Sequence, residues 1–129
     1  MKNEQGVLEA AAHLVSQFAT HDFDGYFSCF ADDTVFIFYT TKKVLKTKKE
    51  YQEEWRTWEK ELSFSVRACS STNQRVQMFE EMAIFSHDVS TTILTNDGTN
   101  TFAERETIVF HYLADKWIAV HEHLSPMPE

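Results

Sequence analysis

The spacing of apolar residues changes near the middle of the chain, and this change restricts the possible folds. Up to about Glu61, apolar residues recur mostly every three or four positions, which is the period of an amphipathic helix. From Ser63 onward, runs of β-branched and aromatic residues alternate with turn signals, as in an antiparallel meander. Helices that come first and strands that come last predict the α+β class.

Two helices are predicted before residue 31. One apolar stripe runs from Gln5 to Thr20, and Asp22 follows it as the predicted cap of a short aromatic helix. The segment Ala31-Asp32-Asp33 then interrupts the pattern. We interpret Asp32 and Asp33 as a helix stop and turn, and not as a catalytic acid pair, because adjacent side chains usually point apart.

A hairpin and a third helix are predicted next. The segment from Thr34 to Thr40 is typical of a strand, and a short return strand is expected near Val44-Leu45. Thr47-Lys48-Lys49-Glu50 matches a capping box, in which the hydroxyl and the carboxylate each bind a free backbone amide. The third helix is therefore predicted to run from this box to about Glu61.

The remaining half of the chain is predicted to be an antiparallel meander. Asn96-Asp97-Gly98 is the strongest hairpin signal, because Asp-Gly readily adopts the positive φ angles of a tight reversal. The expected strand runs are Ser63 to Ser71, Arg75 to Phe79, Met82 to Thr95, Thr99 to Leu113 and Trp117 to Leu124.

Length and composition favour one domain over residues 1–129 with a substantial apolar core. The chain is 43% hydrophobic and 14% aromatic, which suits either packed rings or a ring-lined cavity. Its formal net charge of -8 would repel phosphate backbones, so binding to nucleic acid is not predicted.

The N-terminal segment and the cysteines bear on the compartment. Glu9 and His13 interrupt the N-terminal apolar stretch, and no run approaches ~18 apolar residues, so neither export nor membrane insertion is predicted. Cys29 and Cys69 have no metal-binding spacing and are typical of buried thiols in a reducing cytoplasm, although a disulfide between them stays open at this point.

One late strand has large apolar residues on both faces. Ile108 and Phe110 share one parity, while Val109 and Leu113 share the other. The helices of this chain can cover one face of the sheet, and the simplest cover for the other face is the same sheet of a second copy of the chain. The sequence thus predicts a homodimer.

Two segments resemble a known superfamily. The segment from Phe30 to Phe36 (FADDTVF) resembles the helix-to-strand junction of SnoaL-like, ketosteroid-isomerase-like proteins, also called nuclear-transport-factor-two-like. The segments from Arg105 to Phe110 and from Trp117 to Ser125 resemble their final hairpin. The resemblance implies three N-terminal helices packed on a curved, mostly antiparallel sheet, which together form a cone with an apolar pocket.

The resemblance leaves the activity open. Relatives range from isomerases, dehydratases and polyketide cyclases to non-catalytic assembly domains, and a fold does not select among these functions. In a steroid isomerase, a carboxylate on a strand lies opposite a tyrosine and a protonated acid. We identify no carboxylate in this sequence that would take that position. Steroid isomerisation is therefore not predicted.

A polar set lies on the last two predicted strands. Arg105 is the candidate to hold a carboxylate or enolate oxygen, and His123 is the candidate general base, with Ser125 or Thr107 orienting it. Strand alternation places His121, His123 and Ser125 on one face. Whether this face lines the pocket or the surface stays open.

Other candidate roles are a metal site and an aromatic wall. His121-x-His123 has the spacing of a two-histidine metal face, but no matched carboxylate accompanies it, so we predict no metal and no cofactor. Phe38, Tyr39, Trp55 and Trp58 are predicted to line the pocket, with plain core packing as the other interpretation.

Two functions follow as hypotheses. The first is a protein that binds a small hydrophobic or carbonyl-containing molecule, either as a binder or as a cofactor-free isomerase, lyase or cyclase that uses acid-base chemistry. The second is a non-catalytic dimerisation or assembly domain of the same fold. An enclosed cavity with Arg105 or His123 pointing into it would favour the first, and a cone filled with side chains would favour the second.

Overall fold

The computed structural model describes residues 1–129 and contains three helices and five strands. The α+β class predicted from the sequence is confirmed. The elements follow in the order α1 (Glu4–Ala19), α2 (Phe23–Phe27), β1 (Phe30–Phe38), α3 (Lys48–Leu62), β2 (Ser65–Phe79), β3 (Met82–Thr95), β4 (Gly98–Leu113) and β5 (Lys116–Pro126).

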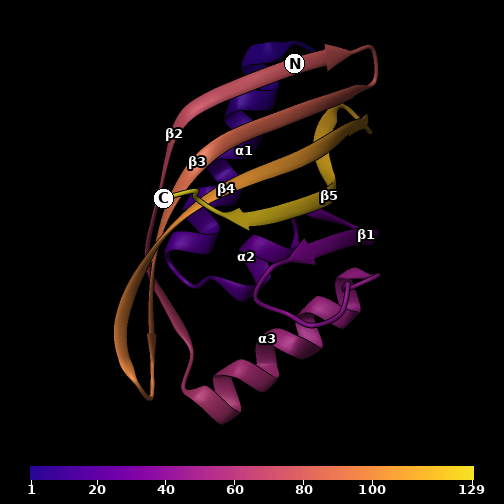
Figure 1. The fold of residues 1–129 in the computed structure, drawn as a ribbon. Coiled ribbons are helices and arrows are strands. Elements are labelled where there is room, and N and C mark those ends of the chain that lie inside the picture. The colour runs from indigo at the N-terminus through magenta and orange to yellow at the C-terminus, as the bar shows by residue number, and fades with distance from the viewer.

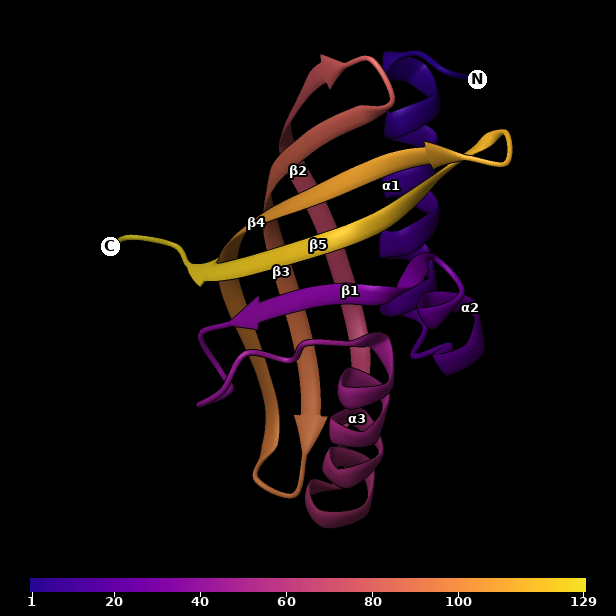
Figure 2. The same cartoon turned by 90° about the vertical axis from the view of Figure 1, so that its right-hand side faces the viewer.

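The five strands form one curved sheet in the order β1-β5-β4-β3-β2. Strands β2 to β5 pair antiparallel with their sequence neighbours, whereas β1 at the edge pairs parallel with β5. The long strands β2, β3 and β4 bend strongly, and the helices lie against the concave side of the sheet (Figures 1 and 2). This is the curved, mostly antiparallel arrangement that the resemblance implies.

Three predicted features differ from the structure. The expected runs before and after residue 72 form a single strand, β2, in which the register shifts between Thr72 and Arg75 and Asn73 takes a positive φ of 51°. A bulge of this kind bends a strand without ending it. Asp32 and Asp33 lie within β1 and do not form a turn, and the return strand is reduced to one bridge between Phe36 and Leu45.

The helix starts agree closely with the predicted caps. The Asp22 side chain accepts a hydrogen bond from the Gly25 amide, and the Thr47 hydroxyl accepts one from the Glu50 amide at 3.1 Å. The Glu50 carboxylate binds the Lys46 amide, one residue earlier than in a standard capping box. None of the helices has both the length and the apolar composition needed to cross a lipid bilayer.

Trp55 joins the helices to the sheet. Its side chain is fully buried, and its ring lies 5.5 Å from the ring of Tyr26, 5.5 Å from Phe27 and 5.1 Å from Phe64, measured between centroids. Its indole Nε1 donates to Glu59 at 3.1 Å, so the buried polar group is satisfied. This cluster packs α3 against α2 and against Phe64, which precedes β2.

Candidate functional site

The inward face of β4 and β5 determines which polar side chains reach the interior. On β4, Glu104 and Ile108 are buried, and Glu106 lies on the same face between them. Ile108 pairs with Glu122 on β5, which is also buried. Because side chains alternate along a strand, these residues point inward together.

A cavity of about 350 Å³ lies between this face and the helices. Fifteen of its 23 lining residues are hydrophobic, so its wall is mainly apolar. The apolar lining includes Leu14, Phe18, Phe38, Tyr51, Trp58, Leu62, Phe64, Val89, Ile93, Phe102 and Leu124.

The charged lining of the cavity is entirely acidic. Asp97, Glu104, Glu106 and Glu122 line it, and no lysine, arginine or histidine does. An anion in this cavity would therefore meet carboxylates without any cation to pair with.

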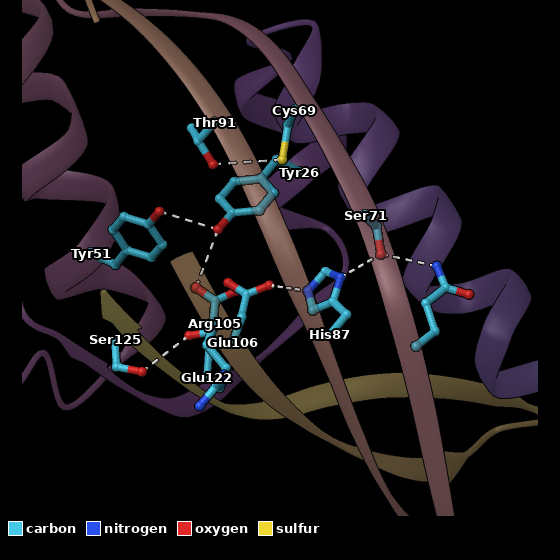
Figure 3. A network of polar contacts seen from close by, with 11 residues as sticks. Tyr26, Tyr51, Cys69, Ser71, His87, Thr91, Arg105, Glu106, Glu122 and Ser125 are labelled. Atoms are coloured by element: carbon cyan, nitrogen blue, oxygen red, sulfur yellow. Dashed lines mark hydrogen bonds and ion pairs between the residues drawn. The ribbon is translucent and has the colours of Figure 1, made fainter. Parts of the chain in front are cut away.

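Glu122 is the most deeply buried of these acids. Its Oε2 accepts a long hydrogen bond of 3.5 Å from the Tyr26 hydroxyl, while its Oε1 is buried without any hydrogen-bond partner. Burial, reinforced by the nearby charge of Glu106, raises the pKa of Glu122 well above its usual value. Burial therefore favours the protonated form of Glu122, whose contact with Tyr26 is drawn in Figure 3.

Two tyrosines complete this end of the cavity. The Tyr26 and Tyr51 hydroxyls lie 3.1 Å apart, and both residues line the cavity. Burial raises the pKa of each phenol well above its usual value. Both tyrosines therefore keep their protons and can act as hydrogen-bond donors.

Glu106 is held from behind by a buried histidine. His87 Nε2 lies 2.7 Å from Glu106 Oε1, and His87 Nδ1 lies 2.5 Å from the Ser71 hydroxyl, which in turn accepts from Gln74 (Figure 3). The His87 side chain is fully buried. A protonated imidazole in this position would pair with a Glu106 carboxylate, so the histidine orients Glu106 at the cavity wall.

Glu104 lies farther along the same face. Its Oε2 accepts a hydrogen bond of 2.6 Å from the Tyr39 hydroxyl. Burial raises the pKa of Glu104, while the Tyr39 hydroxyl acts in the opposite direction. Cys69 also lines the cavity, and burial raises the pKa of its thiol to about 12, which makes it a poor nucleophile.

The predicted aromatic wall is partly present. Phe38, Tyr39 and Trp58 line the cavity. Trp55 does not, because it is completely enclosed by the aromatic core. For Trp55 the core-packing interpretation is therefore the correct one.

The expectation that Arg105 and His123 face the cavity is wrong. Neither lines it, and neither do Thr107, His121 or Ser125. These five residues lie on the other face of the sheet, where Arg105 pairs with Ser125, Thr107 with His123 and Val109 with His121. Arg105 is about half exposed and lies 3.8 Å from Asp88.

A signal for the missed acids was present in β4. Glu104 and Glu106 have the same parity as Ile108 and Phe110, which an alternating strand would bury on one face. His87 has the same parity as Phe85 and Val89 on β3.

Nowhere do three His, Cys, Asp or Glu side chains come together in an arrangement that could hold a metal ion.

Comparisons with known proteins agree on the fold. A family model described as the SnoaL-like domain matches residues 7–129. An NTF2-like protein from Cytophaga hutchinsonii superposes with a TM-score of 0.83 at 13% identity, over 98% of this chain and 100% of that one. No curated protein matches the chain.

Two further solved structures have the same fold. A ketosteroid isomerase-like protein from Erwinia carotovora atroseptica gives a TM-score of 0.79 at 17% identity, over 98% of this chain and 99% of that one. A putative calcium/calmodulin dependent protein kinase II association domain from Xanthomonas campestris gives 0.78 at 17% identity, over 95% and 86%. At these identities the likeness shows the fold alone.

The burial of Glu122 predicts a pH-dependent stability. Above the usual glutamate pKa of 4.5, the unfolded chain releases a proton that folded Glu122 retains, so stability falls as pH rises toward the folded pKa. The Glu122→Gln variant has no titratable group at this position. We expect the free energy of unfolding of the wild type to fall relative to the variant by up to about 1.4 kcal/mol per pH unit above about pH 5.

Urea denaturation at several pH values measures this difference. Glu53→Gln is the matched control, because Glu53 is exposed on α3 and forms no ion pair, and its curve should run parallel to that of the wild type. Parallel curves for wild type and Glu122→Gln would show that Glu122 titrates normally in the folded protein.

Proposed function

The chain belongs to the SnoaL-like domain family, and we propose that its cavity binds a small, largely apolar molecule that carries a carbonyl oxygen. The observation that supports this most strongly is the buried Glu122 Oε1, which has no hydrogen-bond partner in a mainly apolar cavity. A buried polar atom without a partner costs free energy, and a ligand oxygen would relieve that cost.

The donors at this end suit a carbonyl. A neutral Glu122 and the Tyr26 hydroxyl could both donate to one ligand oxygen if Tyr26 turns its proton from Glu122 Oε2, which lies 3.5 Å away, to the ligand. Donors that are fixed before the ligand arrives stabilise negative charge that develops on such an oxygen. An uncharged carboxylic acid is suited to this role at neutral pH.

Glu106 supplies the complementary chemistry. It lines the same cavity and is oriented by His87 at 2.7 Å. A carboxylate in this position could accept a proton from the carbon next to the carbonyl, while Glu122 and Tyr26 stabilise the resulting enolate. The proposed reaction class is therefore cofactor-free proton transfer, as in an isomerase or a lyase.

The proposal replaces the anionic ligand expected from the sequence. That expectation depended on Arg105 as the anchor, and Arg105 lies outside the cavity. A ligand with a permanent carboxylate would face an acidic wall, whereas an enolate formed during a reaction would be held by neutral donors.

Two substitutions at Glu122 test the proposed ligand anchor. Glu122→Gln keeps the volume and can still donate through its amide, whereas Glu122→Met keeps the approximate volume and cannot donate. We expect neutral ketones found by thermal-shift screening to bind the Gln variant about as well as the wild type. The Met variant should bind them about fivefold more weakly, the effect of one neutral hydrogen bond.

Calorimetric titration of the best ketone into each protein provides the numbers. His123→Gln is the control, because His123 is exposed on the other face of the sheet, and it should bind as the wild type does. Equal affinity in the wild type and Glu122→Met would remove Glu122 from the binding site.

The other candidate function is an assembly domain. A row of residues from four neighbouring strands supports it, because Ile84, Val109, His121 and Val35 pair in sequence across the outer face of the sheet and are all partly exposed. A second copy of the chain would cover this row. Pocket binding and dimerisation use opposite faces and are compatible.

The homodimer has a direct test. We expect light scattering at micromolar concentration to give twice the 15.1 kDa mass of the chain. Val109→Lys places a charge in the middle of the row and should shift the mass toward one chain, whereas Ser90→Lys on the exposed part of β3 should not. A wild-type mass near 15.1 kDa would refute the dimer.

A further inference from the structure

We infer that the ligand carries a positive charge, on a protonated amine or a quaternary ammonium group, and that Glu104 is its partner. This inference depends on the proposed function and narrows its ligand class. The ligand would place its carbonyl oxygen at Glu122 and its cation near Glu104, with an apolar body between them.

The distribution of charge in the cavity points to a cation. Four carboxylates line it without any basic side chain. Two of them are already accounted for, since Glu106 is paired with His87 and Glu122 is kept neutral by burial. Glu104 and Asp97 are the remaining acids.

Glu104 is buried but has no cationic partner. Only 5% of the residue is exposed, and its hydrogen-bond donors are the neutral hydroxyls of Tyr39 and Thr91. It forms no ion pair, and the lysines that follow β1 do not reach it. A buried carboxylate needs an opposite charge to offset its lost hydration, and an ammonium group in the cavity would supply that charge.

Aromatic rings line the same cavity as Glu104. Tyr39 and Phe102 line it and are 44% and 42% exposed, which is unusual for rings of this size, and Trp58 lines it from α3. The faces of aromatic rings attract cations, and a combination of rings and a carboxylate is well suited to an ammonium group. A bound ligand would also remove the exposed ring surface from water.

Three acetophenones of nearly equal size separate charge from shape. They carry a para-aminomethyl, a para-hydroxymethyl or a para-carboxylate group and are positively charged, neutral and negatively charged at neutral pH. All three keep the ketone that Glu122 is proposed to bind. Titration calorimetry with wild-type protein should show the amine binding about tenfold or more tightly than the alcohol, and the carboxylate binding most weakly.

Glu104→Gln tests the assigned partner. The Gln carbonyl can still accept the Tyr39 hydrogen bond, so the fold should be kept, and the amine should lose its advantage over the alcohol. Glu53→Gln removes the same charge from an exposed site on α3 and should keep the wild-type ranking. Thermal unfolding of each variant checks that it is folded.

The possible outcomes separate the cationic ligand from the proposed carbonyl-binding function. If the alcohol or the carboxylate binds wild-type protein as tightly as the amine, the cationic ligand is refuted while the carbonyl pocket stands. If none of the three ketones binds, the proposed function fails and the inference fails with it. The ranking in the wild type is decisive without any variant, so an unstable Glu104→Gln would not prevent a result.

Discussion

The site depends on one irregular pairing between β4 and β5. Phe110 pairs with Ala119 and Val109 pairs with His121, so Val120 is an extra residue in β5. Ala119 and Glu122 can therefore both be buried although they are three residues apart. Without the extra residue, strict alternation would direct His121 and His123 inward and Glu122 outward. The bulge thus places a carboxyl group in the interior and two histidines on the outer face.

The burial of Glu122 explains the contacts that surround it. An ionised carboxylate in that position would be costly, and the cost favours the protonated form. Tyr26 and Tyr51 then extend a set of neutral donors, while His87 is positioned to compensate the charge of Glu106 on the neighbouring strand. The environments of Glu106 and Glu122 differ because only Glu106 has a basic partner, His87. Separate environments for neighbouring carboxyl groups are typical of acid-base sites.

Much of the fold could be predicted from local signals, whereas the site could not. The Asp22 and Thr47 caps and the apolar periodicity of α1 and α3 act within a few residues, so the sequence displays them directly. The inward face of β5 depends on its register against β4, which no local pattern in Trp117 to Leu124 reveals. Alternation counted from the buried Trp117 and Ala119 would assign His121 and His123 to the interior, whereas the bulge at Val120 places them on the outer face.

The protonation state of Glu122 is the central claim, and carbon NMR of its side-chain carboxyl group measures it directly. Selective carbon labelling of glutamate, with Glu122→Gln to assign the signal, would follow its chemical shift across the pH range. We expect Glu122 to remain protonated at neutral pH and to titrate well above the usual value of 4.5. A midpoint at or below that value would mean that Glu122 is ionised in the folded protein and would contradict its role as a neutral hydrogen-bond donor.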